Sequence, residues 1–181
     1  AFHVKGQRYS VGDLLGDPSA AGRFVGGAFC IVYLSPRDYH RVHAPVTGPV
    51  HTVRHVGGTL LPVNAFGARN YPGLLARNER VVVVQSKNGA DVASILVGAV
   101  GVGRISLAFD SSVMTNVGRG PTTLRYPPSR APTLARGEEL GIFHLGSTVV
   151  VFVAPELGPR LSAVSGQDVR MGRGLGILEA G

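Results

Sequence analysis

Glycine and proline interrupt the chain at short intervals, and this spacing limits which elements can form. The 181 residues include 26 glycines and 12 prolines, with no long stretch of alanine, leucine, glutamate and lysine between them. Valine-rich segments of strand length lie between these residues, a pattern typical of short strands joined by tight turns. The glycines follow no three-residue period, which excludes a collagen-like chain. We therefore predict a mainly β (β-rich α+β) fold, a sandwich-like or barrel-like β domain with a few short helices.

The length and composition favour one folded unit. The chain is 44% hydrophobic and 16% charged, so it can bury a core and is too apolar for a disordered protein. We expect a single domain over residues 1–181. The longest apolar runs, residues 81–84 and 148–154, are of strand length and well below the roughly 18–20 residues that a membrane-spanning helix needs.

The charge balance is strongly basic. Lysine and arginine number 18 against 11 aspartates and glutamates, for a formal net charge of +7. Such a surface attracts anions, among them nucleic acid, an anionic membrane and phosphorylated small molecules. The sequence has no basic run with interleaved aromatic residues and no tryptophan, so we expect no nucleic-acid partner. The one cysteine, Cys30, lies in an apolar segment, where a buried reduced thiol and a reducing compartment are the plain expectation.

The hydrophobic pattern places strands and loops along the chain. A short helical turn at residues 10–15 has Ser10 as its N-cap. The dipeptide Asn88-Gly89 predicts a hairpin between two strands. Residues 60–79 look like a long loop with one helical turn near 74–77, and the proline-containing residues 118–136 look like a solvated loop. The segments that we expect to be strands are residues 1–9, 24–34, 47–56, 80–86, 91–102 and 138–153.

Four of the six histidines lie close together in the sequence: His40, His43, His51 and His55. Imidazole is the commonest metal ligand, so a metal-dependent enzyme is one hypothesis for this cluster. No carboxylate or thiolate stands at ligand spacing beside the cluster, and His51 and His55 suit exposed strand positions equally well. We expect no metal site and keep the metal-dependent enzyme as an alternative.

Two segments carry a more specific signal. Residues 33–43 read Tyr-Leu-Ser-Pro-Arg-Asp-Tyr-His-Arg-Val-His, and residues 143–148 read Phe-His-Leu-Gly-Ser-Thr. The first ends a strand in a polar turn, and the second interrupts a buried strand with a Gly-Ser step. Together they resemble the phosphatidylserine decarboxylases, pyruvoyl-dependent enzymes that cleave their own chain. The resemblance continues through residues 78–81, 95–99, 166–169 and 174–176, and so covers nearly the whole chain.

The chemistry of these residue types fits such an enzyme. Decarboxylation beside an amine needs an electron sink that ordinary side chains lack, and a pyruvoyl group is one. It can form if the Ser147 hydroxyl attacks the Gly146 carbonyl, the peptide becomes an ester, and elimination and hydrolysis follow. Gly146 has no side chain to obstruct the attack and tolerates a strained backbone. Ser147 also needs a nearby base, oriented by a carboxylate.

The resemblance implies a role for each site residue. It makes His43 the base that activates Ser147 during self-cleavage, and His40 the residue that protonates the substrate carbon after carbon dioxide leaves. Asp38 is implied as an orienting or charge-tuning residue, although a capped turn is its plain structural alternative. Cleavage between Gly146 and Ser147 would leave residues 1–146 as the larger chain, and residues 147–181 as the smaller chain with a covalent pyruvoyl group derived from Ser147.

The implied function is a lyase of phospholipid biosynthesis, made as a zymogen, that converts phosphatidylserine to phosphatidylethanolamine and carbon dioxide. The expected partners are phosphatidylserine and an anionic membrane surface, with the protein peripheral on the cytoplasmic side. Family members are often homodimers, so a homodimer is a further expectation. The leucines and Phe66 of residues 60–75 either contact acyl chains or pack in the core.

One part of the family pattern does not match. The family's relay includes an aspartate in a Pro-Ala-Asp-Gly motif, upstream of the segment that matches residues 5–10, and this sequence contains no such motif. The corresponding region, and the apolar N-terminal part by which members attach to membranes, would precede Ala1. We therefore expect this chain to be the core of a longer precursor. The alternative is an uncleaved, non-catalytic lipid-binding β domain.

Overall fold

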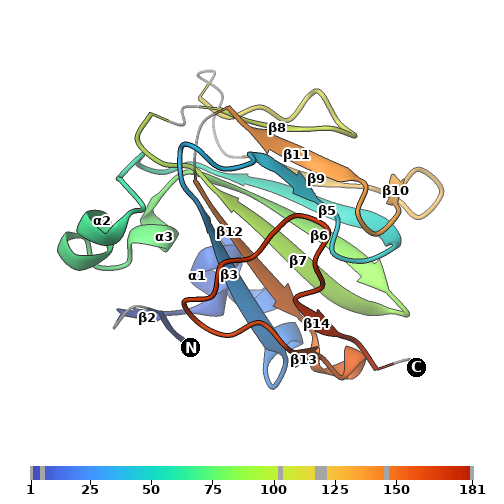
Figure 1. Cartoon of the computed structure of the whole chain (residues 1–181). Coiled ribbons are helices and arrows are strands. Elements are labelled where there is room, and N and C mark those ends of the chain that lie inside the picture. The colour runs from blue at the N-terminus through green and yellow to red at the C-terminus, as the bar shows by residue number, and fades with distance from the viewer. Residues whose placement is uncertain (1, 5–6, 102–103, 117–121, 145–146, 180–181) are drawn as a thin grey trace.

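The structure is a computed structural model that describes residues 2–4, 7–101, 104–116, 122–144 and 147–179 (Figure 1). Strands dominate it, and its few helices are short, which confirms the predicted mainly β class. The strands are β1 (Phe2–Val4), β2 (Gln7–Tyr9), β3 (Ala28–Leu34), β4 (Arg41–His43), β5 (Gly48–Val56), β6 (Arg80–Lys87), β7 (Ala90–Val97), β8 (Ile105–Leu107), β9 (Thr122–Arg125), β10 (Thr133–Leu134), β11 (Glu139–Phe143), β12 (Ser147–Val153), β13 (Arg160–Leu161) and β14 (Gly176–Ile177). The α-helices are α1 (Val11–Leu15), α2 (Ala65–Asn70) and α3 (Leu74–Arg77), and the 3₁₀ helices are η1 (Pro18–Phe24) and η2 (Pro155–Leu157).

A seven-stranded antiparallel sheet forms the centre of the fold. Its strand order is β10-β5-β6-β7-β12-β3, with β9 also paired to β5. The two ends of this path do not pair with each other in the described part of the chain, so the sheet is open and no barrel closes. The predicted hairpin is confirmed: β6 and β7 are joined by Asn88 at φ 51° and Gly89 at φ 80°, the left-handed pair that a type I′ turn requires.

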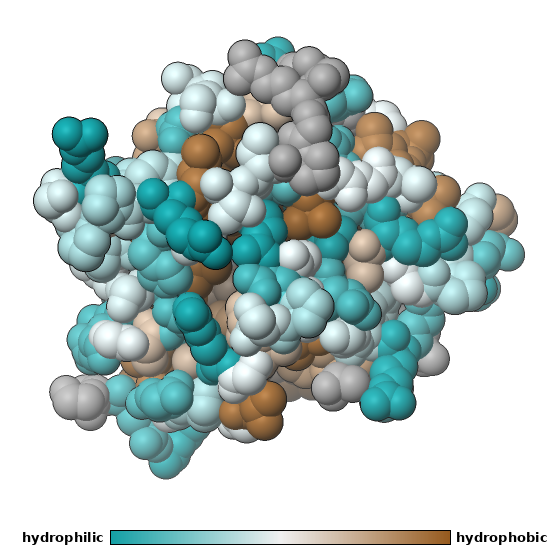
Figure 2. All heavy atoms as spheres, turned by 180° about the vertical axis from the view of Figure 1, so that it is seen from behind, coloured by the Kyte–Doolittle hydropathy of each residue, from teal (hydrophilic) through white to brown (hydrophobic). Residues whose placement is uncertain are grey.

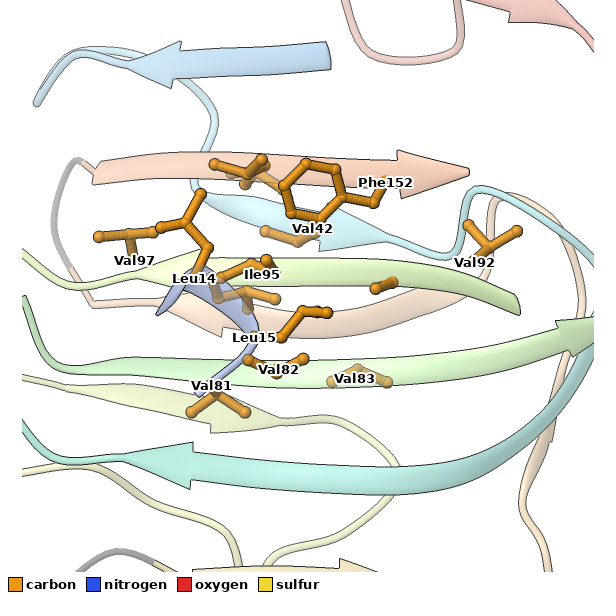
Figure 3. Close-up of a cluster of buried hydrophobic side chains, with 14 of the residues drawn as sticks. Leu14, Leu15, Val42, Val81, Val82, Val83, Val92, Ile95, Val97 and Phe152 are labelled. Carbon is orange, nitrogen blue, oxygen red and sulfur yellow. The ribbon is translucent and has the colours of Figure 1, made fainter. Parts of the chain in front are cut away.

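Layers cover both faces of this sheet, which explains why most positions of β6 and β7 are buried. On one face, Leu14 and Leu15 of α1 lie over Val82 and Ile95 (Figure 3). On the other face lies a three-stranded sheet of order β4-β11-β8. Gly141 of β11 comes so close to the large sheet that an added Cβ would lie 3.4 Å from Leu96 Cδ2. The two sheets therefore pack as a sandwich.

Several sequence predictions need correction. The strand expected at 24–34 is β3, which begins only at Ala28, and the strand expected at 91–102 is β7, which ends at Val97. The strand expected at residues 1–9 is the antiparallel pair β1 and β2, with Phe2 opposite Tyr9. Residues 118–136, expected as a solvated loop, contain β9 and β10, because the edge of β5 supplies hydrogen-bond partners for these polar segments. The loop expected at 60–79 holds α2 as well as α3, since Asn64 caps α2 by accepting a hydrogen bond from Gly67 N.

The side of the molecule opposite to the view of Figure 1 shows no single apolar face. Figure 2 shows apolar side chains scattered among hydrophilic ones on that side of the molecule. No helix in the described residues is long and apolar enough to cross a membrane. Of the apolar residues predicted either to contact acyl chains or to pack in the core, Leu74 and Leu75 are buried, whereas Phe66 is 58% exposed.

Candidate active site

Ser147 lies at one end of the large sheet, at the first position of β12. It is opposite Leu34 of β3, and the next residue, Thr148, is opposite Val97 of β7. The Ser147 side chain is fully buried, and its Oγ has no hydrogen-bond partner among the described residues. Gly146, the other residue of the predicted cleavage site, lies outside the described residues.

The register of β12 shows which way Ser147 points. Ser147 and Val149 share one face of the strand because side chains alternate, and Val149 is directly opposite Leu96. Leu96 is the residue that β11 approaches at Gly141. Ser147 therefore faces the space between the large sheet and the three-stranded sheet.

His40 approaches the same interior from the other sheet. Its carbonyl accepts a hydrogen bond from Phe143 N at 3.0 Å, which extends the pairing of β4 with β11 by one step. Alternation puts His40 on the same side as Val42, which is buried in the core. The Nε2 atom of His40 is buried and has no hydrogen-bond partner among the residues that the structure describes.

Unpaired buried polar atoms are costly, and here they coincide with predicted site residues. Leaving such a group without a partner costs about 1–3 kcal/mol, so native structures contain few of them. Three side-chain atoms are in this position in the described part of the chain: His40 Nε2, Ser147 Oγ and Gln85 Oε1. Two of the three belong to residues predicted for the chemistry. This is the pattern expected where the fold keeps groups available for a reaction rather than for its own stability.

Asp38 folds the turn that leads to His40. Its Oδ2 accepts a hydrogen bond from Ser35 N at 2.7 Å, and its own N–H donates to Ser35 O at 2.9 Å. The hydrogen bonds from Ser35 hold the pKa of the Asp38 carboxyl below its usual value, with a smaller contribution from the charge of His40. Asp38 is exposed and makes no described contact with Ser147. The geometry is that of the capped turn kept as the alternative above.

His43 lies three residues beyond His40, near the other end of the β4–β11 pairing. It is opposite Glu139 on β11, beyond a register shift between Glu139 and Gly141. Its Nδ1 lies 2.8 Å from Gly137 O, and its Nε2 lies 2.9 Å from the Tyr39 hydroxyl. Because Ser147 Oγ has no hydrogen-bond partner among the described residues, it does not bond His43 in this structure. The structure thus places Ser147 and His40 on the two sheets, on the sides that face each other. His43 is instead hydrogen-bonded to Gly137 and Tyr39.

The model of the phosphatidylserine decarboxylase family matches residues 1–177. The chain belongs to this family. It is 43% identical over 180 residues to a phosphatidylserine decarboxylase proenzyme of Pseudomonas fluorescens, covering 97% of this chain and 62% of that protein. Proenzymes of the same name from Shewanella baltica and Shewanella loihica are 44% identical over 158 residues, which is 86% of this chain and 54% and 55% of theirs. The chain therefore spans less than two thirds of the length of these relatives.

Two histidines of the cluster, His51 and His55, each pair with a carboxylate. His51 bonds Asp91 at 3.0 Å, and His55 bonds Glu79 at 2.7 Å, at different positions along β5. Burial alone would raise the pKa of Asp91, but hydrogen bonds from His51 and Arg23 outweigh it and keep that pKa below the usual value. The described residues contain no group of three or more possible metal ligands, so the geometry gives the metal-dependent alternative no support.

The segment Asn78-Glu79-Arg80 supports the Ser147 end of the sheet. The fully buried Asn78 amide donates to Leu61 O and Gly98 O, both at 2.8 Å, and so ties the loop after β5 to the end of β7. The buried Arg80 guanidinium donates to four backbone carbonyls, two of them in α1, at Asp13 and Leu14. Burial lowers the pKa of Arg80 to about 10. The sequence analysis did not predict these structural roles. The signal that could have indicated them is three consecutive polar residues, 78–80, directly before a run of valines.

Proposed function

We propose that this chain is the catalytic core of a pyruvoyl-dependent phosphatidylserine decarboxylase, which converts phosphatidylserine to phosphatidylethanolamine and carbon dioxide after self-cleavage before Ser147. The observation that carries the proposal is the Ser147 hydroxyl at the start of β12, which is buried and has no hydrogen-bond partner within the described part of the chain. Its relatives are named proenzymes, which is consistent with a chain that must be processed. Because the chain covers only part of those relatives, the activity of the whole protein is part of the proposal.

Self-cleavage would begin at the Ser147 hydroxyl. Its Oγ attacks the Gly146 carbonyl carbon, and an ester forms as the peptide C–N bond breaks. The hydroxyl proton passes through an imidazole, which we assign to His43, to the amine that is released. Ser147 suits this attack because its hydroxyl is bound to no other group of the described structure. Loss of the Ser147 Cα proton then expels the Gly146 carboxylate, and hydrolysis with release of ammonia completes the pyruvoyl group.

The surroundings of Ser147 fit a covalent pyruvoyl group at that position. Ser147 is buried, and the neighbouring sheet carries a polar atom, His40 Nε2, that has no hydrogen-bond partner in the described ranges. A pyruvoyl group would supply the carbonyl that takes up the electron pair left when carbon dioxide departs. We assign to His40 the return of a proton to the substrate carbon. Asp38 holds the turn before His40 and adds a nearby negative charge.

We also propose that the protein works at the surface of an anionic membrane, peripherally and on the cytoplasmic side, and that it forms a homodimer. The net charge of +7 supports attraction to anionic lipid headgroups. The exposed Phe66 of α2 is an apolar side chain available for contact with lipid. Sedimentation with phosphatidylserine vesicles, compared with phosphatidylcholine vesicles, tests the membrane part, and light scattering in detergent tests the dimer.

Intact mass measurement of the full-length gene product tests the self-cleavage. We expect two fragments split before Ser147, with the smaller one lacking a free N-terminal amine, and release of carbon dioxide from phosphatidylserine. Ser147→Ala should remain one chain without activity. Ser94→Ala is the matched control, because Ser94 is a buried serine of the neighbouring strand β7, and it should cleave normally. A single uncleaved species that binds lipid without releasing carbon dioxide would overturn the proposal in favour of a lipid-binding domain.

A further inference from the structure

Two neighbouring segments at one end of the large sheet expose apolar side chains. Phe66 of α2 is 58% exposed, and Val100, in the turn after β7, is 61% exposed. The turn lies at the end of the sheet where β12 begins, because Val97, the last residue of β7, is opposite Thr148. In Figure 1, α2 and α3 project from the molecule beside this end of the sheet. Both exposed side chains are therefore at the end that holds Ser147.

Close contacts hold the two segments together and fix the direction of α2. An added Cβ at Gly98 would lie 3.2 Å from Leu60 Cδ2, so the loop before α2 touches the end of β7. An added Cβ at Gly67 would collide with the Pro62 carbonyl oxygen, so the inner side of α2 packs directly on that loop. Phe66 precedes the buried Gly67 and points away from this contact into solvent. The helix thus holds Phe66 outward.

The formal charges on these segments are all positive. Residues 57–78 and 98–109 contain no aspartate or glutamate, and they carry Arg69, Arg77 and Arg104. All three arginines are exposed, and none forms an ion pair with a carboxylate within the described ranges. Exposed apolar side chains among unpaired cations suit an anionic bilayer, because the apolar groups enter the headgroup region while the cations meet lipid phosphates.

We infer that α2, α3 and the turn at residues 98–101 form a docking face for an anionic lipid bilayer, so that the Ser147 end of the fold faces the membrane. The inference rests on the proposed function in taking an anionic membrane as the partner, and it adds the docking face and the orientation. Phe66 and Val100 enter the boundary between headgroups and acyl chains, and Arg69 and Arg77 contact lipid phosphates. A second copy of the chain fits this face less well, because a two-fold axis would set its arginines against one another.

Tryptophan fluorescence tests the docking face directly. The 181 residues contain no tryptophan, so a single introduced one reports on its own surroundings. The assay uses the full-length Ser147→Ala protein, with any tryptophan encoded outside these residues replaced by phenylalanine. Vesicles of phosphatidylcholine and phosphatidylserine carry brominated acyl chains, which quench tryptophan on contact. Phe66→Trp and Val100→Trp should each shift the emission to shorter wavelength, and the brominated lipid should quench it.

Val25→Trp is the matched control. Val25 is 72% exposed, and it shortly precedes Ala28, which is opposite Val153 at the other end of the sheet. Its emission should neither shift nor be quenched. Equal quenching at all three positions, or none at residues 66 and 100, would overturn the inference. A tryptophan at residue 66 that is shielded before vesicles are added would also overturn it: shielding lost on dilution indicates a second copy, and shielding that persists indicates another segment of the precursor.

Charge removal supplies the second test. In the Phe66→Trp protein, Arg69→Gln with Arg77→Gln should raise the lipid concentration for half-maximal quenching about 30-fold, because each arginine at an anionic surface strengthens binding about 5-fold. The matched control is Arg130→Gln with Arg136→Gln, which removes two exposed arginines beside the start of β5. The nine residues of β5 span about 30 Å, well beyond the Debye length of about 8 Å, so this pair should have little effect. Equal losses in the two pairs would overturn the inference.

The Ser147→Ala background separates this inference from the proposed reaction. Docking is measured without self-cleavage and without release of carbon dioxide. Quenching at residues 66 and 100 in a protein whose Ser147 form never cleaves would refute the reaction and leave the docking face in place. Normal cleavage and decarboxylation without quenching at these positions would refute the docking face alone.

Discussion

The sharpest stability prediction concerns the buried side chain of Asn78. Its Nδ2 donates to Leu61 O and Gly98 O at 2.8 Å each, and its Oδ1 accepts from Leu61 N at 3.0 Å and from the Thr59 hydroxyl at 3.1 Å. Asn78 is fully buried, so the bond to Gly98 is shielded from water. Gly98 directly follows Val97, which pairs with Thr148 beside Ser147. Asn78→Ala should therefore weaken both the fold and the support of the strand end at Ser147.

The size of the effect follows from the groups left without partners. Thr59 is exposed and its hydroxyl also bonds Arg77 O, so the loss of its hydrogen bond to Asn78 costs little. Gly98 O is buried, and the N–H and carbonyl of Leu61 are partly buried. At about 1–3 kcal/mol for each buried unpaired group, and less where water can enter, the expected loss is about 3–5 kcal/mol. That is a large part of the roughly 5–15 kcal/mol by which domains of this kind are stable.

Urea unfolding measures this loss directly. The Ser147→Ala background removes the proposed self-cleavage, so that every sample is expected to be one chain. Asn78→Asp tests the cause, because it preserves the volume but turns a carboxylate oxygen towards two carbonyls; it should cost at least as much as Asn78→Ala. Asn70→Ala is the matched control, since Asn70 is exposed and makes one bond, to Phe66 O at 2.8 Å, and its loss should stay below about 0.5 kcal/mol. If both Asn78 variants lose less than about 1 kcal/mol, the reasoning from unpaired groups is refuted.

Two further predictions concern His40 and Asp91. His40→Gln should still self-cleave, as measured by intact mass, but should release carbon dioxide at least about 100-fold more slowly, because a general acid contributes about that much or more. Equal loss of cleavage and decarboxylation would contradict the assignment of His40 to decarboxylation alone. The depressed pKa of Asp91 contributes stability that is present above its unfolded value of about 3.9 and is lost as the pH falls through the lower folded value. Asp91→Asn should therefore unfold more easily than the parent at pH 6 in urea, with the difference shrinking below about pH 4; a difference that stays constant down to pH 2 would rule out this linkage.

Elements defined by local chemistry were predictable from sequence. The Asn88-Gly89 turn requires positive φ at both positions, and these two residue types adopt it most easily, so the hairpin is confirmed. Ser10 caps α1 as predicted, accepting from Asp13 N at 3.4 Å. Residues 122–125 show the opposite case. Their strand forms because β5 offers an edge, and no pattern within those residues could reveal that edge.

The sequence by itself determined the β-rich class, because the spacing of glycine, proline and valine acts through local backbone preferences. It also determined the set of candidate reactive groups, because the Gly-Ser step and the two histidines are visible as residues. Only the tertiary structure decided how those groups face one another. His40 and His43 are three residues apart, yet strand alternation and the register shift in β11 turn His40 towards the interior and give His43 to Tyr39 and Gly137. The pairing of β4 with β11 joins segments almost a hundred residues apart, and it depends on strand register, which a single sequence does not display.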